Sequence, residues 1–384
     1  MGHDRSDWVR GTRSRCRALQ VGAGAVSGIA VHMGRSRLSR CGKCPEQGEG
    51  TARAARLTQT APHLAVEPTP KTSAPSCVAP ASRRSSLPAF GATSGRGKQM
   101  SGPLHIVYEG AEGRILVTDS CTYCDERVKT TDVIIAGSFA GEIAAVMALR
   151  RGARAFLGNA AGVGLDGAGV SGLTLGQRLG APAAALSEQS ARLGDGPDGY
   201  AHGVITRVNE LARGLGVREE MSCAEAATLL LKAPLGVIGR GDAYFDNHHE
   251  IVYDGPEGQV ATMLSVSFAT AANAGQVICA GSHTAAVTGH YVTAYGFPVA
   301  GIICNDAGVG KDHSGIAGLA LLNQAAIPAA SVAAMSARIG SGNSTYEHGI
   351  ISHCNAVAQA RGVRRGQPAK EACLALLRAY QGGR

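Results

Sequence analysis

The most restrictive feature of this sequence is that much of it recurs about 145 residues further along the chain. IVYEGAEGRI, at 106–115, recurs as IVYDGPEGQV at 251–260. Residues 159–194 match residues 305–340 with 17 identities in 36 aligned positions. A repeat of this length exceeds a solenoid unit and has the size of a small domain. The sequence therefore predicts a tandem duplication that gives two similar domains related by an approximate twofold axis.

The order of apolar and helical segments in each copy predicts an α/β fold. Two short strands precede an apolar strand, which is followed by an Ala-rich segment with helical spacing. Strands alternating with helices favour a mainly parallel, doubly wound sheet with flanking helices on both faces. The expected first-copy elements are strands at 106–110, 115–119, 132–138, 153–159 and 182–187, and helices at 140–152, at 170–180, from about 203 to Gly216, and from Ser222.

We expect the first α/β repeat to span residues 104–235 and the second to span residues 236–384. The first 100 residues are rich in Arg, Ser and Pro and have no sustained apolar periodicity, so they are predicted to be a disordered tail. This tail has two possible origins, a leader segment or a start codon assigned too early. We favour the second, because the first convincing strand begins just after Met100.

Charge and cysteine content limit the class of partner. Residues 1–99 hold 16 of the 37 Lys and Arg but 5 of the 29 Asp and Glu, which leaves 21 basic and 24 acidic residues for the rest. The repeats therefore lack the basic excess that nucleic-acid binding requires. No segment is long and apolar enough to span a membrane. The seven cysteines after residue 100 lack the spacing of a disulfide framework, which predicts a cytoplasmic protein. No metal or cofactor is expected.

Polar residues identical in the two copies fall where ligands bind in parallel sheets, at the carboxyl ends of the strands. They are predicted to bind substrate, although the aspartates also suit helix caps and the arginines suit ion pairs that hold loops. The first copy contributes Ser138, Asn159, Asp166, Ser190 and Arg192, and the second contributes Asn305, Ser336 and Arg338.

Differences between the copies point to the second as the catalytic one. At five positions near the same sheet edge, an apolar or small residue of the first copy is replaced by a reactive, polar or ionisable one. Phe139 becomes His283, Ala160 becomes Asp306, Leu165 becomes Lys311, Gly167 becomes His313 and Ala168 becomes Ser314. Of these, Ser314 is predicted to bind substrate together with the residues shared by the two copies.

These residues suggest a small-molecule hydrolase that acts on an amide or ester near a carboxylate. Ser282, at a strand end before a helix, would be the nucleophile, with His283 or Lys311 as base. Asp312 would orient the base, and Arg338 would hold the substrate carboxylate. The predicted catalytic set is Ser282, His283, Asp306, Lys311, Asp312 and His313.

Two other functions remain open at this stage. Lys311, Asp306 and His313 could move protons in a lyase or isomerase of a hydroxy or keto acid. Alternatively, the cleft between the repeats could bind an anion in a regulatory protein. In each case the ligand is expected to be small and anionic. The apolar faces and internal symmetry predict a homo-oligomer.

Overall fold

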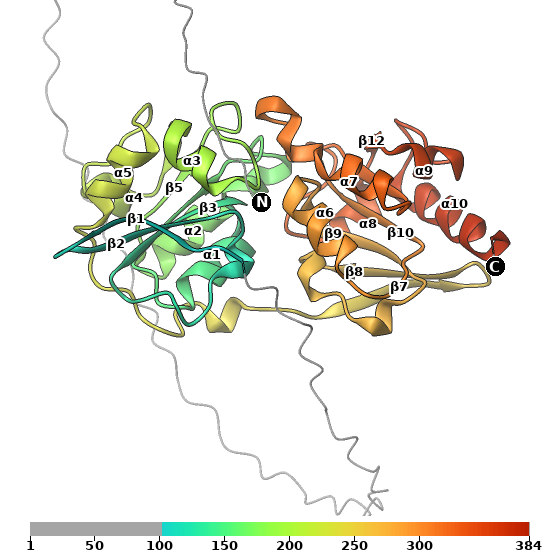
Figure 1. The fold of residues 1–384 in the computed structure, drawn as a ribbon, viewed down its shortest axis with the longest axis horizontal. Coiled ribbons are helices and arrows are strands. Elements are labelled where there is room, and N and C mark those ends of the chain that lie inside the picture. The colour runs from blue at the N-terminus through green and yellow to red at the C-terminus, as the bar shows by residue number, and fades with distance from the viewer. Residues whose placement is uncertain (1–101, 384) are drawn as a thin grey trace, which may run out of the picture. The chain divides into compact units, whose positions relative to one another are not determined.

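The computed structural model of the chain describes residues 102–383, which contain two six-stranded mixed sheets with flanking helices (Figure 1). Both sheets belong to one compact unit. We call the elements from β1 to α5 the first half and those from β7 to α10 the second half. The predicted disordered tail at 1–100 lies outside the described residues.

The first half runs from a β-hairpin through three central strands to a short antiparallel strand. Its strands are β1 (His105–Gly110), β2 (Gly113–Thr118), β3 (Asp132–Phe139), β4 (Ala155–Asn159), β5 (Ala183–Leu186) and β6 (Ile205–Val208). Its helices are η1 (Cys121–Tyr123), α1 (Glu142–Leu149), η2 (Leu165–Val170), α2 (Ser171–Arg178), α3 (Gly196–His202), α4 (Glu210–Gly214) and α5 (Cys223–Leu230).

The second half repeats this order, after a connecting 3-10 helix, η3 (Asp242–Tyr244). Its strands are β7 (His249–Gly255), β8 (Gly258–Met263), β9 (Val277–His283), β10 (Gly301–Asn305), β11 (Ala329–Val332) and β12 (Ile351–Cys354). Its helices are η4 (Val266–Phe268), η5 (Ala271–Asn273), α6 (Ala286–Thr293), η6 (Lys311–Ile316), α7 (Gly318–Gln324), α8 (Gly342–His348), α9 (Ala356–Ala360) and α10 (Ala369–Gly382).

The strand order corrects the doubly wound arrangement expected from the sequence. In each sheet the strands lie side by side in chain order, with no reversal. The second to fifth strands are parallel, and the first and sixth are antiparallel to their neighbours. Because right-handed crossovers in one direction keep their helices on one face, α1 and α2 pack together on the same side. Helices that follow β5, chiefly α3 and α5, contact the sheet on the other side.

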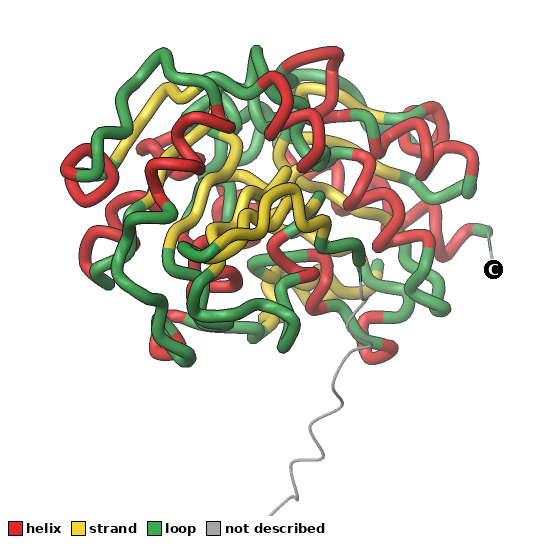
Figure 2. The backbone as a smooth tube through the Cα atoms, turned by 60° about the vertical axis from the view of Figure 1, so that its left-hand side comes forward, coloured by secondary structure: helices red, strands yellow, loops and turns green. Residues whose placement is uncertain are grey.

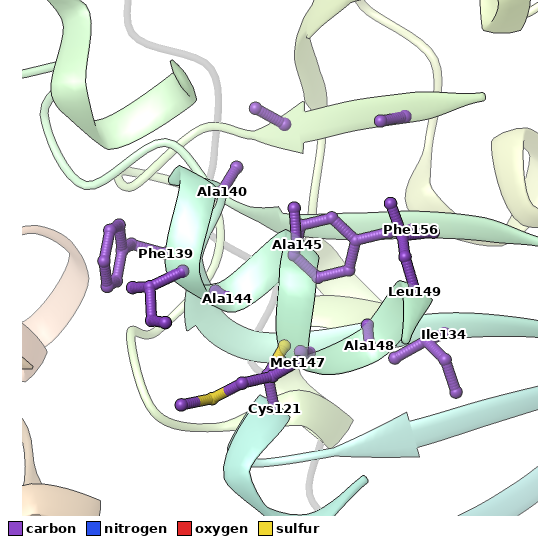
Figure 3. Packing of buried hydrophobic residues seen from close by; sticks show 14 of the residues in the cluster. Cys121, Ile134, Phe139, Ala140, Ala144, Ala145, Met147, Ala148, Leu149 and Phe156 are labelled. Atoms are coloured by element: carbon purple, nitrogen blue, oxygen red, sulfur yellow. The ribbon is translucent and has the colours of Figure 1, made fainter. Parts of the chain in front are cut away.

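Helices flank the strands (Figure 2). Buried apolar side chains, mostly aliphatic, form one cluster on each face of the first sheet. Ile134 and Phe156 point toward α1, whose Ala-rich buried face allows close packing (Figure 3). The same cluster includes Ala285, Ala307 and Ile339 of the second half. The two halves therefore share an apolar core where they meet.

The helix expected from residue 203 is wrong. The chain instead forms α3, which ends at His202, then strand β6, then the short helix α4. The segment pairs antiparallel with β5, with Ile205 opposite Leu186 and Val208 opposite Ala184, which makes it the edge strand of the first sheet. Asn209 caps α4 by accepting from Ala212 N, so it ends the strand rather than lying within a helix. The later helix predicted from Ser222 is confirmed, with a Ser222–Glu225 capping box.

Candidate functional site

The two AGVG loops, residues 161–164 and 307–310, meet where the halves face each other. Ala161, Gly162 and Val163 all have positive φ angles of 50° to 68°, and the equivalent residues of the second loop do the same. A Cβ added to Gly162 would lie 3.0 Å from Gly308 Cα, and one on Gly308 would lie 2.9 Å from Gly162 Cα. The glycines therefore serve close approach of two strained backbones, rather than a phosphate or a substrate.

The predicted substrate-binding arginines are engaged in ion pairs between the halves. Arg192 Nη2 lies 2.7 Å from Asp312 Oδ2, and Arg338 Nη1 lies 2.9 Å from Asp166 Oδ2. The two pairs are reciprocal, since each half supplies one arginine and one aspartate. All four side chains are about half exposed, so water and salt screen both pairs. This arrangement favours the loop-holding interpretation of these residues over substrate binding.

Lys311, a predicted catalytic base, is also paired with the other half. Its Nζ donates to Asp198 Oδ1 at 2.8 Å, to Asp198 Oδ2 at 3.0 Å and to the carbonyl of Ser190 at 3.2 Å. Burial alone would raise the pKa of Asp198, but hydrogen bonds from Lys311 and from the Arg192 backbone outweigh it and lower this pKa. At the equivalent place on the other side, Leu165 and Ser344 replace the two charges.

Asp198 was missed by the sequence interpretation, although a signal for it existed. The same comparison of the copies that singled out Lys311 also has aspartate at 198 where the second copy has Ser344. The lysine of the second half is thus paired with an aspartate of the first half, and the equivalent positions hold uncharged residues.

The asparagines and serines shared by the two copies are occupied by backbone groups. Asn159 Nδ2 donates to Ala191 O, and its Oδ1 accepts from Ala161 N, both at 2.9 Å. Asn305 makes the same two contacts in the second half. Ser190 Oγ accepts from Val204 N at 2.9 Å, and Ser336 Oγ likewise accepts from Ile350 N. These contacts clip neighbouring loops together and use the polar atoms that a substrate would need.

The remaining residues that distinguish the second AGVG loop have separate surroundings. Asp306 is buried, and its Oδ1 accepts from Gly308 N at 3.0 Å and Ala334 N at 2.9 Å. Ser314 Oγ accepts from Leu193 N of the first half at 2.9 Å. His313 is exposed and has a φ of +57°. The structure therefore does not gather Asp306, Lys311 and His313 into one reactive cluster.

A cavity of about 40 Å³ lies elsewhere in the interface, lined by η1, the end of β3 and α1 from the first half and by η4, the end of β9 and α6 from the second. All but one of its lining residues form equivalent pairs from the two halves. The pairs are Ser120 and Ser265, Cys121 and Val266, Thr122 and Ser267, Ser138 and Ser282, Phe139 and His283, Ile143 and Val287, Ala144 and Thr288, and Met147 and Tyr291. Cys121, Met147 and Phe139 are labelled in Figure 3.

His283, predicted from the sequence as a catalytic base, ends β9 and is an ionisable side chain in the lining of this cavity. It is buried, and desolvation lowers its pKa to about 4, so the imidazole is neutral at pH 7. Nδ1 accepts from Ala285 N at 3.3 Å, which places the proton of the neutral ring on Nε2. Among residues 102–383, no hydrogen bond reaches Nε2. The ring lies edge-on to Phe139, with centroids 6.4 Å apart.

Ser282 lines the same cavity but has a structural contact. Its Oγ accepts from Val266 N at 3.0 Å, and Ser138 Oγ accepts from the equivalent Cys121 N at 2.9 Å. Within the described residues, no hydrogen bond joins Ser282 Oγ to His283. Of the predicted catalytic set, the structure therefore brings these two to one cavity without pairing them.

The second half also supplies hydroxyls that the sequence interpretation missed. Tyr291 OH lies 2.6 Å from Thr122 Oγ1, and the Tyr291 ring stacks on Tyr123. Burial raises the pKa of Tyr291 to about 12, so this hydroxyl stays protonated. Thr288 adds another hydroxyl where the first half has Ala144. Comparing the copies along the whole of α1 and α6, rather than at strand ends alone, would have found both.

Searches against protein-family models, curated proteins and solved structures found no match for this chain. Within residues 102–383, no cluster of three or more His, Cys, Asp or Glu side chains is arranged to hold a metal ion. The same part of the chain has no helix that is both long and apolar enough to cross a bilayer.

Proposed function

We propose that this chain binds a small, uncharged polar molecule in the cavity between its two halves. The observation that carries this proposal is the neutral His283 ring, whose Nε2–H has no hydrogen-bond acceptor within the described residues. A carbonyl or similar oxygen on the ligand would accept from it. The hydroxyls of Tyr291 and Thr288 lie on the same lining.

The lining argues against the small anion expected from the sequence. None of the described residues that line the cavity is Asp, Glu, Lys or Arg. Burying an unpaired charge costs several kcal/mol. Only a protonated His283 could neutralise a bound anion, and the pKa of this ring is lowered to about 4, so it carries no charge at pH 7. An uncharged ligand avoids both costs. The volume suits about three water molecules, at roughly 10–15 Å³ each, or a ligand of similar size.

Binding of a small amide such as acetamide tests the proposal directly. We expect acetamide to shift the His283 Nε2–H NMR signal saturably, at millimolar concentrations, and we expect acetate to leave the signal unchanged. His283→Phe, which copies Phe139, removes the donor and should abolish the binding. His313→Gly is the matched control, because it removes an exposed histidine and copies Gly167. Binding that survives His283→Phe, or no saturable shift with acetamide, formamide or acetone, would overturn the proposal.

Hydrolysis of a small amide in this cavity is the second candidate, favoured by the joint presence of Ser282 and His283. A nucleophilic Ser282 would have to pass its proton to a base. Its Oγ accepts a structural hydrogen bond from Val266 N, as Ser138 Oγ does from Cys121 N, and this contact weakens the catalytic role. Ammonia release from acetamide measures the activity. The rate of ammonia release should fall to zero in Ser282→Ala. Ser138→Ala, which removes the equivalent backbone contact, should lower this rate only as far as the structural loss does.

We also infer that the two halves arose by tandem duplication and are related by an approximate twofold axis. Three observations support this: the recurring sequence, the identical strand order, and a cavity lining made of equivalent pairs. The reciprocal Arg192–Asp312 and Arg338–Asp166 contacts are what such an axis requires.

A further inference from the structure

Two buried cysteines of the second half lie in contact. Cys279 is in the centre of β9 and Cys373 is in the second turn of α10, 94 residues later. Their sulfur atoms are 3.4 Å apart, and neither side chain is exposed to solvent. The equivalent positions of the first half hold Ile135 and Ala227, which are also buried and fill the same space without sulfur.

We propose that Cys279 and Cys373 form a reversible disulfide when the protein meets a peroxide. A disulfide needs sulfur atoms about 2.05 Å apart, so the two side chains must approach by little more than 1 Å. Cys121 and Cys124 also share a side-chain hydrogen bond, but they are neighbours in the chain. Cys279 and Cys373 instead join a strand to a helix 94 residues later.

The reaction proceeds in two displacements. One thiolate attacks a peroxide oxygen, the O–O bond breaks, hydroxide leaves and a sulfenic acid forms. The second thiolate attacks that sulfur, the S–O bond breaks and a second hydroxide leaves. With the two protons released from the thiols, the products are one disulfide and two water molecules. The two sulfurs are oxidised, and the peroxide is reduced.

The environment sets the rate of this reaction. The hydrogen bond with Cys373 and burial both raise the pKa of the Cys279 thiol, so little thiolate exists at pH 7. Oxidation therefore depends on local opening of α10 and is slower than that of the half-buried Cys354. Once formed, the bond fastens β9, the strand that ends at His283, to α10.

Peptide mapping of the intact protein after hydrogen peroxide treatment, followed by thiol alkylation, tests this assignment. Trypsin releases Cys373 in residues 371–378 and places Cys279 together with Cys304 in residues 241–311. We expect these two peptides to be joined, about 2 Da lighter than their sum, and to separate with dithiothreitol. Cys304→Ala should keep the cross-link, and Cys279→Ala and Cys373→Ala should lose it.

A thermal melt supplies a second measurement on the wild-type protein. Because the bond closes a loop of 94 residues, we expect oxidation to raise Tm by about 5–10 °C. The proposal fails if Cys373 is recovered only as free or sulfinic cysteine after peroxide treatment continued until the backbone amides of α10 have exchanged completely, because α10 has then opened. It also fails if the cross-link persists in Cys279→Ala, since Cys304 would then be the partner.

Discussion

Removing the ion pair between Lys311 and Asp198 tests what joins the two halves. The Asp198 side chain is 5% exposed and also accepts from Arg192 Nη1 at 3.1 Å and from Arg192 N at 2.7 Å. In Lys311→Leu, which copies Leu165, these two contacts remain. We therefore expect unfolding to become easier by about 1–3 kcal/mol, less than the 3–5 kcal/mol typical when a buried charge loses every partner.

The reciprocal variant completes a double-mutant cycle. Asp198→Ser copies Ser344, whose Oγ accepts from Arg338 N at 2.9 Å, so the Arg192 N–H should stay bonded. Lys311, at 23% exposure, then reaches water, and the expected loss is about 1–2 kcal/mol. The double variant reproduces the Leu165 and Ser344 arrangement of the other side. We expect it to be more stable than the sum of the single changes predicts, by about 1–2 kcal/mol.

Urea unfolding followed by circular dichroism measures all four proteins. The folded state lowers the pKa of Asp198 below its ordinary value of 3.8. The stabilisation from this carboxylate is therefore present above pH 3.8 and is lost as the pH falls through the folded pKa. The advantage of the wild type over the double variant should shrink in the same range. Single effects that simply add, at pH 7, would refute the idea that the two charges act as a pair.

Two further predictions concern the loops and the cavity. Gly162→Ala adds a Cβ at a φ of +68° and 3.0 Å from Gly308 Cα, so we expect the free energy of unfolding to fall by about 2–4 kcal/mol in thermal or urea unfolding. Gly167→Ala has the same φ but open space around the Cβ, so the fall should be only about 1 kcal/mol. Equal losses in the two variants would contradict the close approach of the loops. The pKa of His283 is about 4 in the folded protein against 6.5 ordinarily, so the unfolded chain binds a proton first as the pH falls. The free energy of unfolding should therefore fall by up to about 3 kcal/mol between pH 6.5 and 4. His283→Phe should remove this pH dependence, and a variant with the wild-type pH profile would argue against a neutral buried ring.

The α/β character of the chain was predictable because its central strands are continuous apolar runs that end in glycine, serine or asparagine. The short segment Ile205–Val208 was not, since four residues with three exposed or half-exposed side chains carry little periodic signal. Its pairing with β5, which makes it a strand, is a contact between segments that the local sequence does not encode. Strand order posed the same difficulty, because alternating strands and helices fit both sequential and reversed sheets.

The candidate site shows where comparison of the two copies helps and where it misleads. The replacement of Phe139 by His283 singled out a residue that ends β9 and lines the cavity between the halves. The replacement of Leu165 by Lys311 was interpreted as chemistry, although the partner that neutralises it, Asp198, lies 113 residues away in the sequence. A lysine in one half and the aspartate that pairs with it in the other are recognised from the sequence only when the differences in both halves are considered together.

The strained AGVG loops have a consequence for how the protein unfolds. Val163 and Val309 are β-branched residues with φ above +60°, a conformation that costs about 1–2 kcal/mol for each such residue. Each loop is completed by a carbonyl of the opposite half, since Leu165 N donates to Ala334 O at 2.9 Å and Lys311 N donates to Glu188 O at 2.7 Å. When one half unfolds, the loop of the other half loses the hydrogen bond that offsets its backbone strain, so it cannot keep its conformation. Residues 102–383 should therefore melt in a single cooperative transition, and not as two independently folding modules.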